Sequence, residues 1–122
     1  MKTIILVEDE KMVREGLRDV LEREGFIVYE AQDGLEAMQL LTTVKPDLLV
    51  TDIIMPDSDG FELLFSLKDS GHTFPVLVMS GGGRIGSNDY LKMVQVIGYK
   101  QVLHKPFSIS EFLEKINTMI GS

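Results

Sequence analysis

The 122-residue chain contains no cysteine, no tryptophan, only four prolines and no long apolar run. The absence of cysteine excludes disulfides, zinc–thiolate centres and thiol nucleophiles, and it suits a reducing compartment. No apolar stretch reaches the roughly 20 residues that a membrane helix needs. The first residues, MKTIILVEDE, become acidic too early for a secretory signal peptide. We therefore expect a soluble, cytoplasmic domain.

Basic residues are also scarce, with twelve against nineteen acidic residues and a formal net charge of -7. This balance opposes binding to nucleic acid or to anionic lipid unless the basic residues cluster. Lys11, Arg14, Arg18 and Arg23 are instead spread among acids, as on a solvated helix face. The sequence therefore predicts neither a nucleic-acid partner nor a membrane partner. Its length and its 44% hydrophobic content fit one domain, residues 1–122, with one core.

Five short apolar runs alternate with five amphipathic stretches, a pattern typical of β-α units around a parallel sheet. The runs IILV, LLV and VLVM do not alternate with polar residues, as expected for interior strands that helices cover on both faces. The run FIVYE is less uniform and better suited to an edge. The predicted strands are Thr3–Val7, Phe26–Glu30, Asp47–Thr51, Val76–Met79 and Val102–Leu103.

Apolar stripes and capping residues indicate where the helices lie. Gly25 follows the first stripe as a helix stop, and His72 lies in a polar turn where we expect it to be solvent-exposed. The stripes consist of Val13, Leu17, Val20 and Leu21, and of Ile109, Phe112, Leu113, Ile116 and Ile120. Three helix starts pair a capping oxygen with a Glu three residues later, namely Asp33 with Glu36, Asp59 with Glu62, and Ser108 with Glu111.

Chemically active side chains stand where the predicted strands end. In an open α/β sheet, ligands bind beyond the carboxyl ends of the strands. Clustered carboxylates there repel one another unless a cation neutralises them, and Mg²⁺ prefers oxygen ligands. A lysine and a hydroxyl beside such a site meet the needs of phosphoryl transfer to a carboxylate. The residues in question are Glu8, Asp9, Asp52, Ser80 and Lys105.

Four motifs, in this order along the chain, resemble the receiver domain of two-component response regulators. They are VEDE (7–10), VTDIIMPDSDG (50–60), MSGGG (79–83) and HKPF (104–107). The resemblance covers essentially the entire chain, and it is to a stand-alone receiver, similar to the chemotaxis receiver protein. It implies one receiver domain over residues 1–122 without an output domain. It also implies a doubly wound, flavodoxin-like five-stranded parallel sheet with strand order 2-1-3-4-5, an order known from this family.

The resemblance also implies partners and residue roles. The phosphodonor would be a histidine kinase or a phosphotransfer protein, and the phosphorylated domain would signal to an unknown downstream protein rather than act as an enzyme. The Lys105–Pro106 bond is expected to be cis. The implied roles are phospho-acceptor for Asp52, Mg²⁺ ligation for Glu8, Asp9, Asp52 and the backbone carbonyl of Ile54, and phosphoryl contacts for Ser80 and Lys105.

Val102 departs from the family pattern, which usually carries Tyr or Phe at this switch position, three residues before the lysine. Valine has no ring to turn inward and few χ1 states, and Tyr99 is a poor substitute by spacing. We therefore expect phosphorylation to rearrange the glycine loop, residues 81–86, more than it moves any buried ring.

Alternative functions stay open on the sequence alone. The glycine loop GGGRIG fits the dinucleotide pattern GxGxxG, although it follows the fourth strand rather than the first. A flavin- or nucleotide-binding module on the same fold is therefore an alternative. A degenerate receiver acting as a constitutive adaptor is another, which the complete acidic cluster opposes. A phosphomonoester hydrolase is disfavoured because Ile53 and Ile54, rather than a second acid, follow Asp52.

Overall fold

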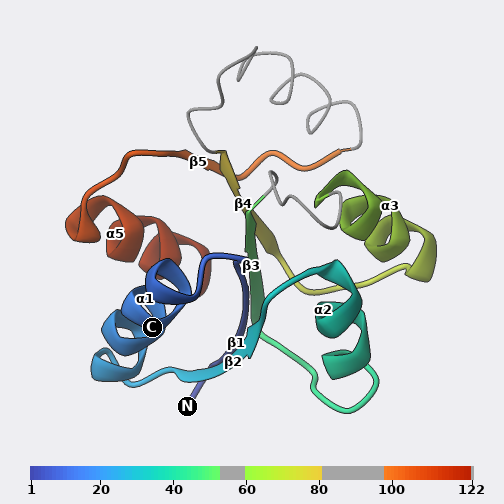
Figure 1. The fold of residues 1–122 in the computed structure, drawn as a ribbon, viewed down its shortest axis with the longest axis horizontal. Coiled ribbons are helices and arrows are strands. Elements are labelled where there is room, and N and C mark those ends of the chain that lie inside the picture. Colours follow the sequence, from blue (N-terminus) through green and yellow to red (C-terminus); the bar gives the residue numbers. More distant parts are fainter. Residues whose placement is uncertain (53–59, 81–97, 122) are drawn as a thin grey trace.

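A computed structural model of the chain describes residues 1–52, 60–80 and 98–121, which form a parallel sheet between two layers of helices (Figure 1). The strands are β1 Thr3–Val7, β2 Ile27–Ala31, β3 Leu48–Asp52, β4 Val76–Ser80 and β5 Val102–His104. The helices are α1 Lys11–Arg23, α2 Gly34–Leu40, α3 Gly60–Ser70 and α5 Ile109–Ile120. All neighbouring strands are parallel and their order is β2-β1-β3-β4-β5, which confirms the predicted fold.

The core has two layers because the pleat of each strand sends alternate side chains to opposite faces. In β1, Ile5 and Val7 pack on the side of α2 and α3, whereas Ile4 and Leu6 pack on the side of α1 and α5. Figure 1 shows these two helix pairs on opposite faces of the sheet. β1, β3 and β4 are interior strands and β2 is an edge strand, as predicted.

Strand boundaries differ from the predicted ones by one residue at several ends. β2 runs from Ile27 to Ala31 because these residues pair one by one with β1. The side chain of Asp47 accepts a hydrogen bond from the backbone N–H of Thr3 at 2.7 Å, and β3 begins after it. β3 extends to Asp52, which pairs with Met79 of β4. Backbone pairing with β4 therefore extends β3 as far as Asp52, one of the predicted site residues.

The helix ends largely follow the capping signals. Asp33 accepts a hydrogen bond from the N–H of Glu36 at 2.9 Å, and Ser108 and Glu111 form a complete capping box. Gly25 has a φ of 94°, in the left-handed region that follows a helix end. Asp59, the predicted start of α3, lies outside the described residues. Ile109 was placed on the apolar stripe of α5, but it is half-exposed, and the buried part of that stripe begins one turn later.

His72 is half-buried, so its predicted exposure is wrong. Its ring lies between two oxygens, with Nδ1 2.8 Å from the carbonyl of Phe74 and Nε2 3.1 Å from the hydroxyl of Tyr99. The Tyr99 hydroxyl in turn donates to the carbonyl of Leu64 at 3.1 Å. The turn after α3 is polar in sequence, yet it supplies a side chain to a partly buried hydrogen-bond network. Tyr99 precedes β5, so it lies toward the amino end of that strand, whereas Asp52 lies at the carboxyl edge of the sheet.

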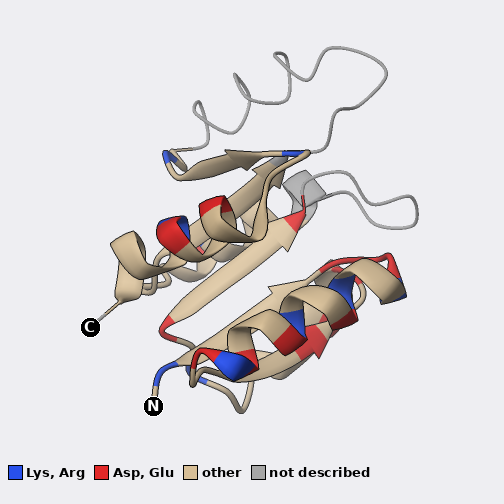
Figure 2. Cartoon of the chain, turned by 90° about the vertical axis from the view of Figure 1, so that its left-hand side faces the viewer, with Lys and Arg blue, Asp and Glu red and all other residues tan. Residues whose placement is uncertain are grey.

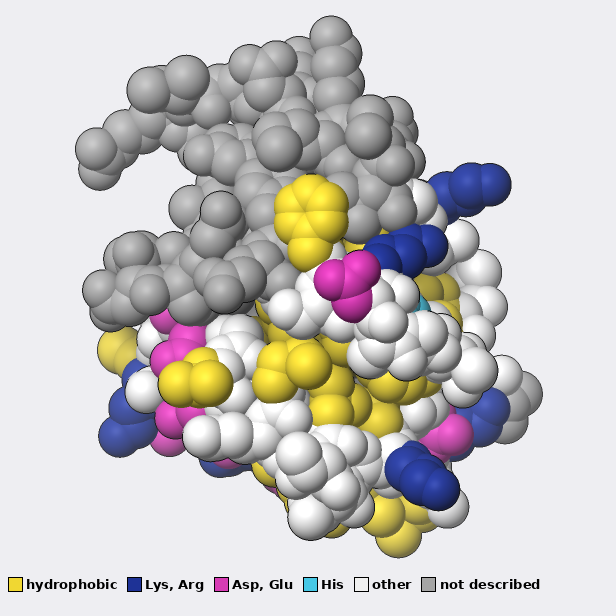
Figure 3. All heavy atoms as spheres, turned by 90° about the vertical axis from the view of Figure 1, so that its right-hand side faces the viewer, with side chains coloured by type: hydrophobic (Ala, Val, Ile, Leu, Met, Phe, Trp, Pro, Cys, Tyr) yellow, Lys and Arg dark blue, Asp and Glu magenta, His cyan; other side chains and the backbone are white. Residues whose placement is uncertain are grey.

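The face formed by α2 and α3 carries apolar surface (Figure 3). Leu35 and Phe65 are more than half exposed there. A hollow of about 530 Å³ is lined by the apolar side chains of Met38, Leu67 and Phe74 among others. Among the described residues, no helix has both the length and the apolar character that crossing a membrane requires.

Two glycines, one inside α1 and one just beyond its end, have opposite conformational requirements, which gives a test of the helix end. Gly25 needs a positive φ, so Gly25→Ala should lower the free energy of unfolding by about 1 kcal/mol. Gly16 lies within the helix and has open space where a Cβ would stand, so Gly16→Ala should raise it by about 0.5–1 kcal/mol. Urea unfolding measures both. Effects of the same sign would contradict this description of the helix end.

Candidate functional site

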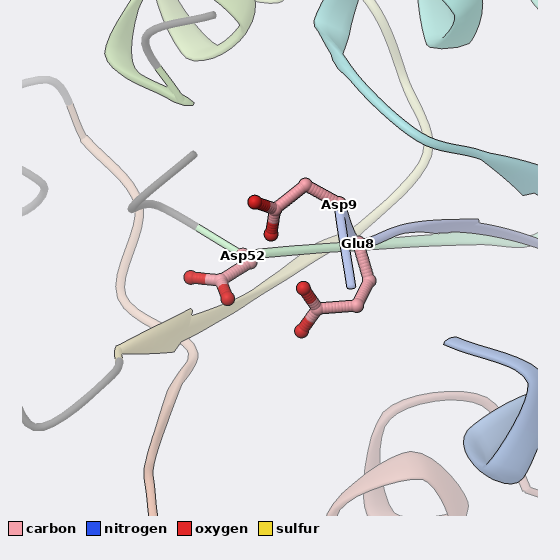
Figure 4. Close-up of side chains that lie close together, drawn as sticks. All are labelled: Glu8, Asp9 and Asp52. Carbon is pink, nitrogen blue, oxygen red and sulfur yellow. The ribbon is translucent and has the colours of Figure 1, made fainter. Parts of the chain in front are cut away.

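Acidic side chains from two neighbouring strands meet at the carboxyl edge of the sheet. Glu8 and Asp9 follow β1, and Asp52 is the last residue of β3, which pairs with β1. Figure 4 shows the three carboxylates pointing toward one another. One oxygen of each lies within 4.8 Å of the others. The structure therefore brings together the three acids that the sequence predicted to converge.

Lys105 directly follows β5, which lies on the other side of β4 from Asp52, and its side chain reaches this cluster. Its Nζ donates to Oε1 of Glu8 and to Oδ2 of Asp52, both at 2.7 Å. The side chains of these two acids are only 1% and 6% exposed, so the ion pairs are sheltered from water. The peptide bond from Lys105 to Pro106 is cis, as expected. A single ammonium thus lies between two of the three carboxylates.

Burial and crowding perturb the ionisation of this cluster. Burial raises the pKa of Glu8 to about 7. The hydrogen bond from Lys105 opposes this increase, and contacts with Asp9 and Asp52 add to it. For Lys105, burial lowers the pKa, but the hydrogen bonds to Asp52 and Glu8 outweigh burial and raise it. The lysine is therefore held in its charged form, whereas Glu8 is a carboxylate that resists ionisation.

Other predicted site residues are described only in part. Ser80 is the last residue of β4 and pairs with His104 of β5 along the backbone, but its hydroxyl lies outside the described part of the chain. Ile54 and the glycine loop also lie outside the described residues. Val102 is half-buried and packs against the core on the side of α2 and α3. The roles that the sequence assigned to these residues stay predictions.

The sequence analysis missed Arg14, a residue in contact with the site. In the sequence it looks like part of a solvated face, because the basic residues of α1 stand among acids. Figure 2 shows both kinds of charge along this helix. Its side chain is only 14% exposed, and its Nη1 donates to the backbone carbonyl of Glu8 at 2.8 Å. The available signal was an arginine in the first turn of the helix that follows the acidic pair. Sequence alone could not separate it from the three other basic residues nearby.

Comparisons with known sequences agree with this geometry. The family model for the response regulator receiver domain matches residues 4–117. Response regulator MprA of Mycobacterium sp. (strain KMS) is 32% identical over an alignment of 126 positions, and the alignment covers 96% of this chain and 50% of that protein. The chain thus spans about half the length of the curated relatives it matches. The prediction of a single receiver without an output domain stays a prediction.

Solved structures share the fold. The receiver domain of the Francisella response regulator 1452 has a TM-score of 0.84 at 28% identity, covering 98% of this chain and 96% of that one. The chemotaxis response regulator CheY4 of Vibrio cholerae has a TM-score of 0.86 at 23% identity, covering 98% and 99%. This second similarity concerns the fold alone.

The raised pKa of Glu8 predicts how stability depends on pH in the absence of metal. The ordinary value is 4.5 and the folded value about 7, so between them the folded protein retains a proton that the unfolded chain has lost. This contribution to stability is complete below the ordinary value and is lost as the pH rises through about 7. Relative to Glu8→Gln, the free energy of unfolding of the wild type should fall by about 1–3 kcal/mol between roughly pH 5 and 8. Urea unfolding at several pH values measures it, and parallel curves for the two proteins would contradict the buried, proton-holding Glu8.

Proposed function

The chain belongs to the response regulator receiver domain family, and from this premise we propose that Asp52 accepts a phosphoryl group from a histidine kinase or a phosphotransfer protein. One observation carries the proposal. The carboxylate of Asp52 ends an interior strand and stands beside Glu8, Asp9 and Lys105. A nucleophile on a strand that is paired on both sides has little freedom to move, which favours attack in one fixed direction.

The proposed reaction is a transfer between two nucleophiles. An oxygen of Asp52 attacks the phosphorus of a phosphohistidine, and a new O–P bond forms while the P–N bond breaks. The imidazole leaves with the electron pair of the broken bond and takes a proton from solvent. Asp52 becomes an acyl phosphate, and the negative charge at this position increases. Lys105, whose Nζ is 2.7 Å from Asp52, is placed to offset the added charge.

The donor set fits Mg²⁺ as the metal of this site. Three carboxylates offer oxygens within 4.8 Å of one another, and hard oxygen ligands are those that Mg²⁺ prefers. Glu8, Asp9 and Asp52 would hold the ion, and family resemblance adds the carbonyl of Ile54. When bound, the ion would neutralise the carboxylates and the charge that develops on the phosphoryl oxygens. Lys105 would then share Glu8 and Asp52 with the metal ion.

Lys105 would couple phosphorylation of Asp52 to a conformational change in the rest of the domain. Its ammonium now links Asp52 on β3 with Glu8 after β1, so a phosphoryl group on Asp52 changes the balance of its contacts. Ser80 and Lys105 would be drawn to the phosphoryl oxygens, and the segments that carry them would move. Val102 offers no ring for the aromatic rotation usual in the family. We propose that the resulting change in the surface is recognised by a downstream protein partner.

Family membership favours this function over a flavin- or nucleotide-binding module on the same fold. Phosphorylation itself separates a working receiver from a degenerate one that acts as a constitutive adaptor. Turnover separates a phosphoryl acceptor from an enzyme, because an acceptor takes up one phosphoryl group per chain whereas an enzyme releases product repeatedly.

Intact-mass measurement after incubation with acetyl phosphate and Mg²⁺ tests the proposal. We expect one added phosphoryl group on the wild type and none on Asp52→Asn, since an amide oxygen is a far weaker nucleophile than a carboxylate. Asp47→Asn is the matched control, because Asp47 immediately precedes the opposite end of the same strand, and it should be labelled like the wild type. Omitting Mg²⁺ and adding EDTA should remove most of the label.

Two results would contradict the proposed function. One is a wild type that gains no mass under these conditions. The other is Asp52→Asn gaining as much as the wild type, which would place the phosphoryl group on another residue.

A further inference from the structure

We propose that Arg14 is a positioning residue that fixes the peptide between Glu8 and Asp9 and thereby sets the affinity of the acidic cluster for Mg²⁺. The inference rests on the proposed function, since it concerns the same metal site. It adds a role for α1, whose charged residues the sequence analysis placed on a solvated face. The role belongs to two hydrogen-bond donors of the guanidinium rather than to its charge.

The backbone of Glu8 is anchored on both sides. Its N–H donates to the carbonyl of Ala31 at 3.0 Å, which ties it to the end of β2. Its carbonyl accepts a hydrogen bond from Nη1 of Arg14 at 2.8 Å. Because a peptide unit is planar and rigid, holding this carbonyl fixes the orientation of the whole unit that leads into Asp9. The hydrogen bond from Arg14 therefore constrains the peptide unit that joins the two acids of the motif.

Arg14 is itself fixed by the edge strand. Its Nε donates to Oε1 of Glu30 at 3.2 Å, and the other oxygen of Glu30 accepts from Nη1 of Arg18 at 2.8 Å. Glu30 and Ala31 are consecutive residues of β2. One residue of this strand holds Glu8 directly, and the residue before it holds Glu8 through Arg14. The guanidinium can donate to Glu30 and to the carbonyl of Glu8 at the same time because it presents several N–H groups in a fixed plane.

The orientation of this peptide matters because Mg²⁺ demands a near-ideal arrangement of its ligands. A tilt of the peptide moves the Cα of Asp9, and with it the carboxylate that Figure 4 shows turned toward Asp52. Residues that orient metal ligands without touching the metal typically change affinity by about 10- to 100-fold when they are replaced. Arg14 stands in that relation to Glu8 and Asp9.

Charge and positioning make opposite predictions for Arg14. A cation beside the acidic cluster repels Mg²⁺, so removing the charge would strengthen metal binding if Coulomb interaction were its main effect. Removing a positioning bond would weaken metal binding. Arg18 supplies the control, because it lies one turn further along α1 and pairs with the same Glu30. Among the described residues its other ion pairs are with Asp19 and Glu22 rather than with the Glu8 peptide.

The test is an NMR titration of the full chain with Mg²⁺, following the backbone amides, for the wild type, Arg14→Gln, Arg14→Lys and Arg18→Gln. We expect about tenfold weaker binding for Arg14→Gln. Arg14→Lys should lose affinity to a similar extent, because an ammonium keeps the charge but cannot reproduce the planar fork. Arg18→Gln should bind like the wild type. With acetyl phosphate, the Mg²⁺ concentration needed for half-maximal labelling of Arg14→Gln should rise, while the rate at saturating Mg²⁺ changes little.

Three results would overturn the inference. They are tighter or unchanged Mg²⁺ binding in Arg14→Gln, full rescue by Arg14→Lys, and an equal loss in Arg18→Gln. The amide spectra report whether each variant is folded, and Arg14→Lys alone carries the test if Arg14→Gln is not. A wild type that binds no Mg²⁺ refutes this inference together with the proposed metal site. Unchanged affinity in Arg14→Gln, with a wild type that binds Mg²⁺ and is phosphorylated, refutes the inference alone.

Discussion

Three carboxylates and one ammonium share a sheltered edge of the sheet, and the function of this fold depends on keeping that charged cluster together. Burying carboxylates side by side is unfavourable, because each loses hydration and repels the others. The pKa of Glu8, raised to about 7, expresses this cost. Lys105 reduces it by donating to Glu8 and Asp52 at 2.7 Å each. A divalent cation would reduce it further, so the strain in the cluster is also the source of its affinity for metal.

The parallel sheet is what makes this crowding possible. Because every strand runs in the same direction, the chain leaves the sheet at the same edge after β1, β3 and β5. The interior strands are apolar on both faces, and helices cover them on both sides, so their ends cannot drift apart. Asp52 is part of β3 rather than of the following loop. The edge strand β2 contributes as well, since Glu30 and Ala31 reach Glu8 through Arg14 and through the backbone.

The sequence was sufficient for features that depend on local patterns. Unbroken apolar runs identified the three interior strands, capping pairs located two of the helix starts, and the acids at the ends of the first and third strands predicted the cluster. The strand order came from family resemblance, because alternation of strands and helices does not by itself fix which strands are neighbours. Lys105 was recognised, like the acids, from its position after a predicted strand, and the family motif assigned its role.

Features that depend on distant polar partners were not predictable. Arg14 and Glu30 are 16 residues apart, and His72 and Tyr99 are 27 apart. A charge in a helix or a histidine in a turn looks solvated until its partner is placed beside it. Strand ends shifted for a similar reason, because pairing with a neighbour such as β1 decides where a strand stops, and hydropathy does not record pairing.

The central claim is that Glu8, Asp9 and Asp52 form one metal site at the carboxyl edge of the sheet. Crystals of the protein grown or soaked with Mn²⁺, a close substitute for Mg²⁺ that scatters anomalously, test it most directly. The account predicts one strong anomalous peak bounded by these three carboxylates. A peak elsewhere, or carboxylates that lie too far apart to share an ion, would contradict it.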